Sequence, residues 1–344
     1  MGRKPFDSCD EPFLPRSVGR KAFENILREQ ADRIAIHHRP VILLCVWLHQ
    51  FGHSLLDFLY PAFELWKTFQ TDDEDLVIFS DFDEMAVVGD PWVTYQSLEL
   101  LGKVANFRWV VHQLQQRNNV DYFCFDRLLV GLKRHGVYDS ADVPENGHRH
   151  FRNYILQKIG MPESSQSMDG TDTQGADNAL TTCRAVYVQR TEKRRLLNEA
   201  DVVETIQRTL GTSCTVESVD FNRNMTLIDQ IRYVSSATWL ISLAGSGSHQ
   251  MLWLPDGAVS LVILHPFHHD KDVNKVICDH MTTILCLQSE SVVPDGVDVP
   301  EDPMARKNVD VNAKLSELEA AIVRGMQRRT SPTTTAIATG GGSN

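Results

Sequence analysis

The groups of this sequence best suited to binding an anion are three arginines and a loop of small residues. The loop reads Ala-Gly-Ser-Gly-Ser at residues 244–248. Guanidinium groups match the geometry and charge of phosphate oxygens. Glycine lets the backbone approach a phosphate, and the first N–H groups of a following helix have no partner within that helix. The residues predicted to hold a phosphate-bearing ligand are Arg190, Arg194, Arg195, Gly245, Ser246, Gly247 and Ser248.

These groups lie where strand-like and helix-like segments alternate. Short apolar or alternating runs predict strands, and cap residues with helical periodicity predict helices between them. Such alternation favours a parallel sheet, which binds ligands at the carboxyl ends of its strands. We therefore expect the arginines and the small-residue loop to meet at one sheet edge. The predicted strands are 185–189, 214–221, 238–243 and 259–264, and the predicted helices are 201–210 and 227–236.

Arg190 is the strongest of the three arginines because it stands where a predicted strand ends. Lys193, Arg194 and Arg195 can equally form a solvated turn, so both interpretations stay open for them. Arginine after the first strand, in place of a glycine-rich turn, disfavours a dinucleotide or S-adenosylmethionine enzyme.

A second group of candidates lies in the first half of the chain. On a helix predicted at residues 52–69, His53 and Asp57 are four residues apart and share a face, with Glu64 further along the same side. An imidazole oriented by a carboxylate suits a general base at neutral pH. The alternative is that His53 only caps this helix or packs beneath the neighbouring loop.

Two further clusters have the residue types of a metal site. Asp81 and Asp83 follow a strand predicted at residues 76–80, and they can contact an acceptor or a metal, or be ordinary turn residues. Metal binding is not expected there, because hard cations need additional oxygen ligands. The histidine-rich segment 265–270 lacks cysteine or glutamate partners, so zinc is not expected either.

Composition narrows the classes of protein that this chain can represent. Its 344 residues are enough for two domains, and the net charge of -11 argues against nucleic acid as the main partner. The seven cysteines lack zinc-type spacing and indicate reduced or buried thiols more than a disulfide framework, with one or two bridges left open. No secretory signal is expected in the charged first forty residues, and the apolar run 41–48 is too short to span a bilayer.

The predicted organisation follows from shifts in composition along the chain. Strand 41–48, helix 92–101 and a segment around Cys124 complete the first lobe, and a helical pattern at 309–328 is expected to cross back to it. Residues 162–179 have almost no apolar content and cannot form a core. The predicted parts are an arm (1–40), an N-terminal lobe (41–161), a linker (162–179), a C-terminal lobe (180–300), a C-terminal helix (301–330) and a disordered tail (331–344).

Five segments, in this order along residues 41–266, resemble glycosyltransferase family 61, which includes xylosyltransferases and N-acetylglucosaminyltransferases. Two positions depart from the family pattern, with Ala244 in place of histidine and Gln50 in place of asparagine. Family members usually carry an N-terminal anchor, so the resemblance implies an anchorless relative or a truncated gene model. The segments that carry the resemblance are 51–57, 124–132, 187–199, 226–231 and 245–258.

The resemblance implies an α/β fold with two Rossmann-like lobes of GT-B type, mainly parallel sheets and a cleft between them. A UDP-sugar donor would bind mainly to the C-terminal lobe and a glycan or glycoprotein acceptor to the N-terminal lobe. Transfer of N-acetylglucosamine or xylose would invert the anomeric centre without a required metal cofactor. The implied location is the lumen of the Golgi or endoplasmic reticulum, with the cytoplasm left open. The alternative is a catalytically silent relative that binds nucleotide or glycan.

Overall fold

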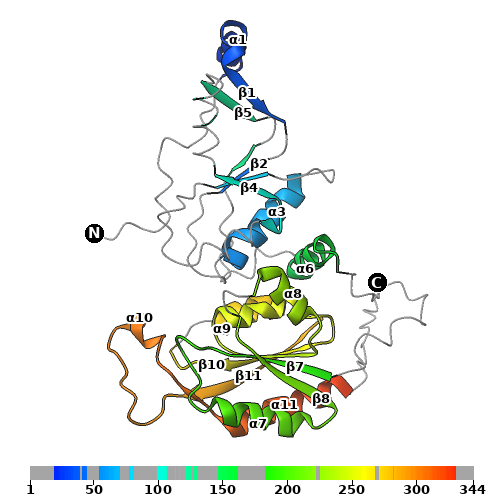
Figure 1. Ribbon diagram of the computed structural model, residues 1–344, viewed down its shortest axis with the longest axis vertical. Helices are drawn as coiled ribbons and strands as arrows, with labels where there is room; N and C mark the ends of the chain where they lie inside the picture. The colour runs from blue at the N-terminus through cyan, green and yellow to red at the C-terminus, as the bar shows by residue number, and fades with distance from the viewer. Residues whose placement is uncertain are drawn as a thin grey trace, which may run out of the picture. The chain divides into compact units, whose positions relative to one another are not determined.

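The structure is a computed structural model that divides into two compact units (Figure 1). The N-terminal unit contains Met1–Glu163 and Arg223–Arg232, and the C-terminal unit contains Ser164–Asn222 and Tyr233–Asn344. The residues described are 19–38, 41–44, 54–69, 77–80, 99–106, 113, 116, 121–125, 128–130, 146–161, 183–221, 225–267, 271–281 and 283–330.

The N-terminal unit is built on a four-stranded parallel sheet. Its order is β4 (Lys103–Asn106), β3 (Val77–Ser80), β2 (Val41–Leu44) and β6 (Leu128–Val130). The predicted strand 76–80 is confirmed, and the start of the strand predicted at 41–48 is confirmed as far as Leu44, beyond which the described residues do not continue. Most of the helix predicted at 92–101 also lies outside the described residues.

Residues within the predicted N-terminal arm have regular structure. Helix α1 (Arg20–Glu29) and the short η2 (Ala31–Arg33) precede β1 (Ile34–His37). β1 pairs in parallel with β5 (Tyr122–Phe125), which contains Cys124. This pairing was not predicted, because it joins segments that are far apart in the chain.

The helix predicted at 52–69 is present in two parts. Residues Ser54–Leu59 form the π-helix η3, and Tyr60–Phe69 form α3. A π-helix makes i→i+5 hydrogen bonds, so it does not keep the α-helical phase. Glu64 therefore does not follow Asp57 with the α-helical spacing that was predicted. Helix α6 (Gly147–Lys158) packs beside α3 through aromatic contacts such as Phe63 with Phe151.

The C-terminal unit contains a six-stranded sheet in which five strands are parallel. β12 pairs antiparallel with β11, and every other neighbouring pair is parallel. All five residues of β9 are buried, as expected of a central strand covered on both faces. The order is β12 (Asn312–Ala313), β11 (Leu285–Val292), β10 (Val259–Leu264), β9 (Trp239–Leu243), β7 (Cys183–Val188) and β8 (Cys214–Val219).

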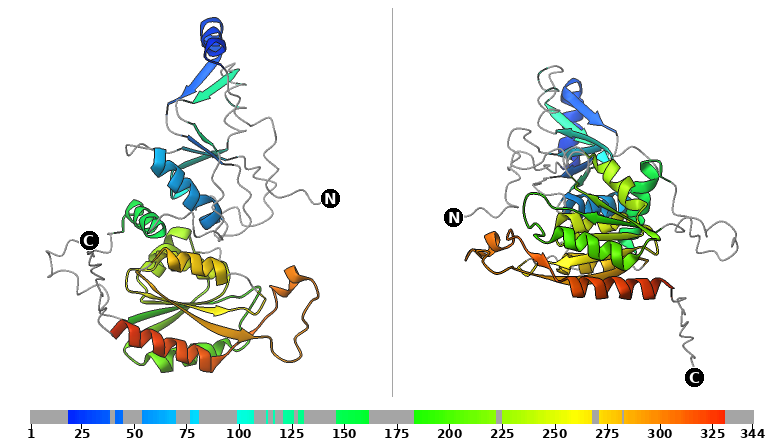
Figure 2. Two further views of the ribbon diagram at one scale, coloured as in Figure 1. Left: turned by 180° about the vertical axis from the view of Figure 1, so that it is seen from behind. Right: turned by 60° about the horizontal axis from the view of Figure 1, so that its bottom comes forward.

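The two helices predicted in this part of the chain are present. α7 (Glu199–Leu210) and α8 (Leu227–Ser235) match the two predicted helices to within two residues at each end. α7 packs beside α11 on one face of the sheet, and α9 (Lys271–Asp279) lies on the other (Figures 1 and 2). The two units with their mainly parallel sheets confirm the predicted α/β class with two lobes.

The last helix stays with the C-terminal unit. α11 (Leu315–Thr330) inserts Leu318, Ala321 and Ile322 into the same hydrophobic core as Trp239. The expectation that this helix crosses back to the first lobe is therefore wrong, because its apolar side matches the sheet of its own unit. A short α10 (Pro303–Arg306) lies in the connection that precedes β12.

Two disulfides crosslink the C-terminal unit, so the preference for reduced thiols was wrong. Cys183–Cys214 joins facing residues at the start of β7 and β8, and Cys278–Cys286 joins α9 to β11. Strand register brings the first pair together, which cysteine spacing does not reveal. Cys124 is the free cysteine among the residues that the structure describes. Within the same residues, no helix has both the length and the apolar character needed to cross a bilayer.

Candidate functional site

The candidate site lies where the strand order of the C-terminal sheet reverses. From β7 the chain passes through α7 to β8 on one side, and β9 and β10 then follow on the other side. β7 and β9 are direct neighbours, with Val188 facing Ser242 in the register. Their connections leave in opposite directions, and in open α/β sheets ligands bind beyond the carboxyl ends of strands at such a point.

Arg190 and Arg194 meet Gly245 at this reversal point. A β-carbon built on Gly245 would lie 2.2 Å from Arg190 Nη1 and 3.1 Å from Arg194 Nη1. Gly245 also has φ of 141°, which side-chain-bearing residues rarely adopt. The prediction that a cationic strand end and a small-residue bend come together is therefore confirmed for these two arginines.

Arg195 points to a different partner. Its guanidinium pairs with Asp310, at 3.0 Å from Nε and 2.6 Å from Nη2 to Oδ2. The two consecutive arginines separate because Arg194 has the left-handed φ of 57°. The structure thus brings Arg190 and Arg194 to the loop and leaves Arg195 at an exposed ion pair beside it.

The small-residue loop continues into the 3₁₀-helix η6 (Ser246–Trp253), with Gly245 as its N-cap residue. Ser248 is fully buried, and its hydroxyl lies 2.7 Å from the Gly245 carbonyl oxygen and 2.8 Å from Asn274 Oδ1 on α9. This hydroxyl therefore orders the loop, in contrast to the predicted direct contact with a ligand. Ser246 and Gly247 are half-buried. A β-carbon on Gly247 would lie 3.2 Å from Val188 Cγ1.

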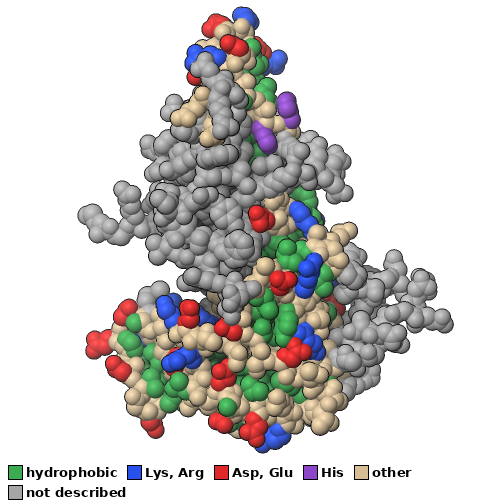
Figure 3. Space-filling model, in the orientation of Figure 1, with side chains coloured by type: hydrophobic (Ala, Val, Ile, Leu, Met, Phe, Trp, Pro, Cys, Tyr) green, Lys and Arg blue, Asp and Glu red, His purple; other side chains and the backbone are tan. Residues whose placement is uncertain are grey.

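The positive charge of this site is local. On the face of the C-terminal unit seen in Figure 3, acidic and basic side chains are interspersed and are not segregated by sign. An anion would thus be attracted by the arginines at the strand end and by the amides of the loop, and not by a broad cationic surface.

His265 has a structural role at the end of β10. The Phe267 N–H donates to His265 Nδ1 at 3.2 Å, so Nε2 carries the proton and donates to the Val309 carbonyl oxygen at 2.8 Å. The rest of the predicted histidine cluster, 268–270, lies outside the described residues. Among those that are described, no group of three His, Cys, Asp or Glu side chains could hold a metal ion.

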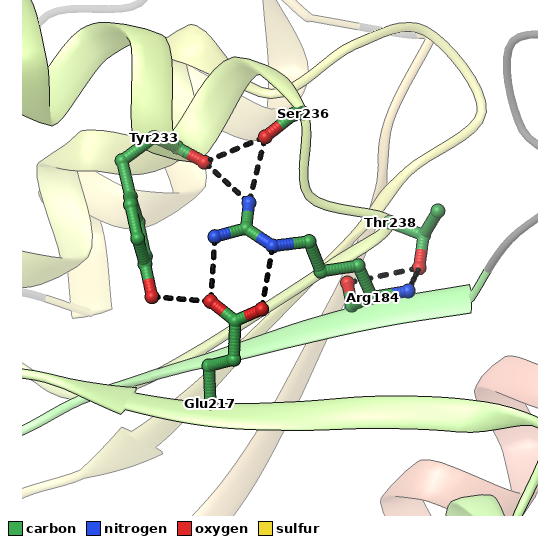
Figure 4. Close-up of polar contacts among 5 residues, drawn as sticks. All are labelled: Arg184, Glu217, Tyr233, Ser236 and Thr238. Atoms are coloured by element: carbon green, nitrogen blue, oxygen red, sulfur yellow. Dashed lines mark hydrogen bonds and ion pairs between the residues drawn. The ribbon is translucent and has the colours of Figure 1, made fainter.

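A polar cluster that sequence reasoning missed surrounds Arg184 on β7 (Figure 4). Its guanidinium contacts both Glu217 carboxylate oxygens, at 3.1 and 2.7 Å, and donates to the Tyr233 carbonyl oxygen at 2.7 Å. The Tyr233 hydroxyl also donates to Glu217. These hydrogen bonds hold the pKa of Glu217 below its ordinary value of 4.5. The cluster fixes the end of α8 to the sheet, far along β7 from Arg190.

Of the candidate site residues in the N-terminal unit, the structure describes only Asp57, and only its backbone. His53, Asp81 and Asp83 lie outside the described residues, and Asp57 is described by its backbone in the π-helix η3. Their roles as base, acceptor contact or metal contact stay predictions.

A curated protein of another organism resembles this chain in sequence. The chain is 25% identical over 269 residues to protein O-linked-mannose β-1,4-N-acetylglucosaminyltransferase 2 of Takifugu rubripes, covering 72% of this chain and 43% of the relative. The chain thus spans less than half the length of that curated relative.

Three solved structures align weakly with this chain. Heptosyltransferase WaaC of E. coli with ADP-2-deoxy-2-fluoro heptose aligns with a TM-score of 0.36 and 12% identity, over 86% of this chain and 100% of the other. WaaC with ADP aligns with a TM-score of 0.38 and 11% identity, over 85% of this chain and 97% of the other. The glycotransferase of kitacinnamycin aligns with a TM-score of 0.30 and 10% identity, over 85% of this chain and 94% of the other.

The family comparison is decisive for classification. The family model described as Glycosyltransferase 61 matches residues 51–261, which include Arg190, Arg194 and the loop at Gly245. Because this match covers more than half of the 344 residues, the chain belongs to glycosyltransferase family 61.

Proposed function

We propose that this protein is an inverting glycosyltransferase that moves a sugar from a UDP-sugar to a hydroxyl of a glycan or glycoprotein. The observation that carries the proposal is the contact of the Arg190 and Arg194 guanidinium groups with Gly245 at the reversal point of the sheet. The family and the relative's name are consistent with this chemistry.

The proposed donor contacts act on the leaving group. As the bond between the sugar C1 and the phosphate oxygen breaks, negative charge builds on the diphosphate. Arg190, Arg194 and the loop amides would stabilise that charge, and UDP then leaves. Because the guanidinium groups supply positive charge at this position, we expect no requirement for a divalent metal. Activity should therefore persist in excess EDTA, and its loss would refute this part of the proposal.

The acceptor half of the reaction needs a base. We propose that His53, oriented by Asp57, takes the proton of the acceptor hydroxyl as its oxygen bonds to C1 on the face opposite to UDP. The π-helix η3 that contains Asp57 is consistent with this role, since such helices often occur at functional sites. Asp81 and Asp83 are proposed as acceptor contacts.

The relative's name indicates which donor and acceptor to test first. Its name specifies transfer of N-acetylglucosamine to protein O-linked mannose. We propose UDP-N-acetylglucosamine as the first donor to test and UDP-xylose as the second. The two disulfides of the C-terminal unit support a location in an oxidising compartment, the lumen of the Golgi or endoplasmic reticulum.

The test is UDP release from each donor with a panel of glycan and glycoprotein acceptors, for the wild type and Arg190→Ala. The variant should lose about 100-fold to 1,000-fold in kcat/KM while its melting temperature changes little. Arg208→Ala is the matched control, because Arg208 forms an exposed ion pair with Glu319 away from this loop. Unchanged activity of Arg190→Ala would overturn the assignment.

The same assay distinguishes the alternative of a silent relative that only binds nucleotide or glycan. Ala244 stands where the family frequently has histidine, and this difference supports the silent relative as a second candidate function. A silent protein would bind UDP without releasing any from a UDP-sugar.

A further inference from the structure

The loop that presents Arg190 and Arg194 is held by a segment more than a hundred residues away in the chain. Asp310 accepts a hydrogen bond from the Arg195 N–H at 2.8 Å through Oδ1, while Oδ2 pairs with the Arg195 guanidinium. The next residue, Val311, donates its N–H to the Arg195 carbonyl oxygen at 3.0 Å and accepts from Leu197. Both backbone groups of Arg195 are thus fixed by the segment 309–311.

The fixed backbone of Arg195 constrains the backbone conformation of Arg194. Arg194 directly precedes it and has the left-handed φ of 57°, which is unfavourable for a residue with a side chain. Surrounding contacts must maintain such a conformation, and the clamp on Arg195 is one peptide unit away. Arg194 in this conformation places its guanidinium 3.1 Å from the ideal β-carbon position of Gly245.

The segment that supplies the clamp is anchored at both ends. Before Asp310, the Val309 carbonyl oxygen accepts the hydrogen bond from buried His265. After it, Ala313 exchanges hydrogen bonds with the Asn198 side chain. Asp310 is therefore presented from a fixed backbone, and it lies outside residues 51–261 that the family model matches.

We propose that Asp310 is a positioning residue for the diphosphate of the donor. Its carboxylate orders Arg195 and thereby holds Arg194, and with it the loop of Arg190, against Gly245. Arg190 belongs to the same ordered unit because its Nε donates to the Lys193 carbonyl oxygen at 3.1 Å. This inference rests on the proposed function of the arginines.

The ion pair between Arg195 and Asp310 is largely exposed on the arginine side. Such pairs contribute little to stability. A role in positioning therefore predicts a loss of ligand affinity that is out of proportion to any loss of stability. A merely structural role predicts the reverse.

The experiment measures UDP binding by calorimetry and the melting temperature of the full chain. Asp310→Asn should weaken UDP binding by roughly tenfold to 100-fold, because a displaced binding group can cost about 100-fold. Its melting temperature should change little. The matched control is Glu319→Gln, which breaks another exposed ion pair of the same unit and should leave UDP affinity unchanged.

Two further variants make the outcome decisive. If Asp310→Asn does not fold, Arg195→Ala takes its place. This variant keeps the hydrogen bond from the residue 195 N–H to Asp310, so it should weaken UDP binding, but less. The double variant Asp310→Asn with Arg195→Ala should be no weaker than Asp310→Asn alone, because both act through one contact. Suppose that Arg190→Ala binds UDP poorly. Normal UDP affinity of Asp310→Asn would then overturn this inference. If Asp310→Asn does not fold, normal UDP affinity of Arg195→Ala would do the same. Normal affinity of Arg190→Ala would instead overturn the proposed function itself.

Discussion

The guanidinium of Arg190 lies where residue 245 would carry its side chain. An ideal β-carbon on Gly245 would be 2.2 Å from Arg190 Nη1, closer than any real β-carbon contact. The absence of a side chain at residue 245 is therefore what lets a cationic strand end lie against the loop after the neighbouring strand.

Gly245→Ala should accordingly displace Arg190 and weaken UDP binding. The φ of 141° adds backbone strain, for which about 1–3 kcal/mol is the usual cost. Because the tip of an arginine is flexible, we expect the sheet to remain folded while affinity falls. Calorimetry with UDP and a thermal melt measure the two effects.

Gly247→Ala is the matched comparison for that variant. A β-carbon there would meet only Val188 Cγ1, at 3.2 Å, and no positive φ is involved. It should weaken UDP binding less than Gly245→Ala does, because the new β-carbon would meet no arginine. If both variants bind UDP like the wild type, close approach of Arg190 to Gly245 has no part in nucleotide binding.

Gly325→Ala should destabilise the protein although alanine is the better helix former. In α11, a β-carbon at residue 325 would lie 2.4 Å from Trp239 Cη2 and 2.9 Å from Leu287 Cδ1. Overpacking of this kind costs about 1–3 kcal/mol, which exceeds the gain of roughly 0.5–1 kcal/mol from helix propensity. Urea unfolding measures the net effect. Arg324→Ala, at an exposed position of the same helix, should change stability little. A more stable Gly325→Ala would show that α11 does not approach the sheet so closely.

Glu217 should make stability depend on pH in the acid range. Hydrogen bonds from Arg184 and Tyr233 lower its pKa from 4.5, so its contribution is fully present above pH 4.5 and is lost as pH falls through the lowered folded value. Glu217→Gln should be less stable than the wild type at pH 7 and should lose less stability between pH 5 and pH 3. Unfolding free energies across this range test the prediction.

The control for Glu217→Gln is Glu290→Gln, which removes a carboxylate from an exposed ion pair with Lys314. Its unfolding free energy should follow the wild-type pH dependence closely. Parallel curves for the wild type and Glu217→Gln would contradict the cluster seen in Figure 4.

The two disulfides should contribute unequally to stability. Their cysteines are 31 and 8 residues apart. Loop-closure entropy gives about 3–4 kcal/mol for the longer connection and about 2–3 kcal/mol for the shorter one. Cys183→Ala with Cys214→Ala should therefore lower the urea midpoint more than Cys278→Ala with Cys286→Ala. Insensitivity of the wild type to a reducing agent under unfolding conditions would argue against both bridges.

The sequence by itself determined the local parts of this protein. Apolar runs bounded by charges and turn residues predicted four of the six strands of the C-terminal sheet, because such runs are typical of strands buried in a parallel sheet. The sequence did not predict β11 and β12. Arg190 was recognisable since it ends one of those strands, and Gly245 since it ends another.

Only the tertiary structure decided which of these groups have which partners. Arg194 and Arg195 are adjacent in sequence, yet one contacts Gly245 and the other pairs with Asp310, 115 residues away. Cys183 and Cys214 form a bridge because the register of two strands places them face to face. Strand order and register set these distances, and neither is encoded in the spacing of residues along the chain.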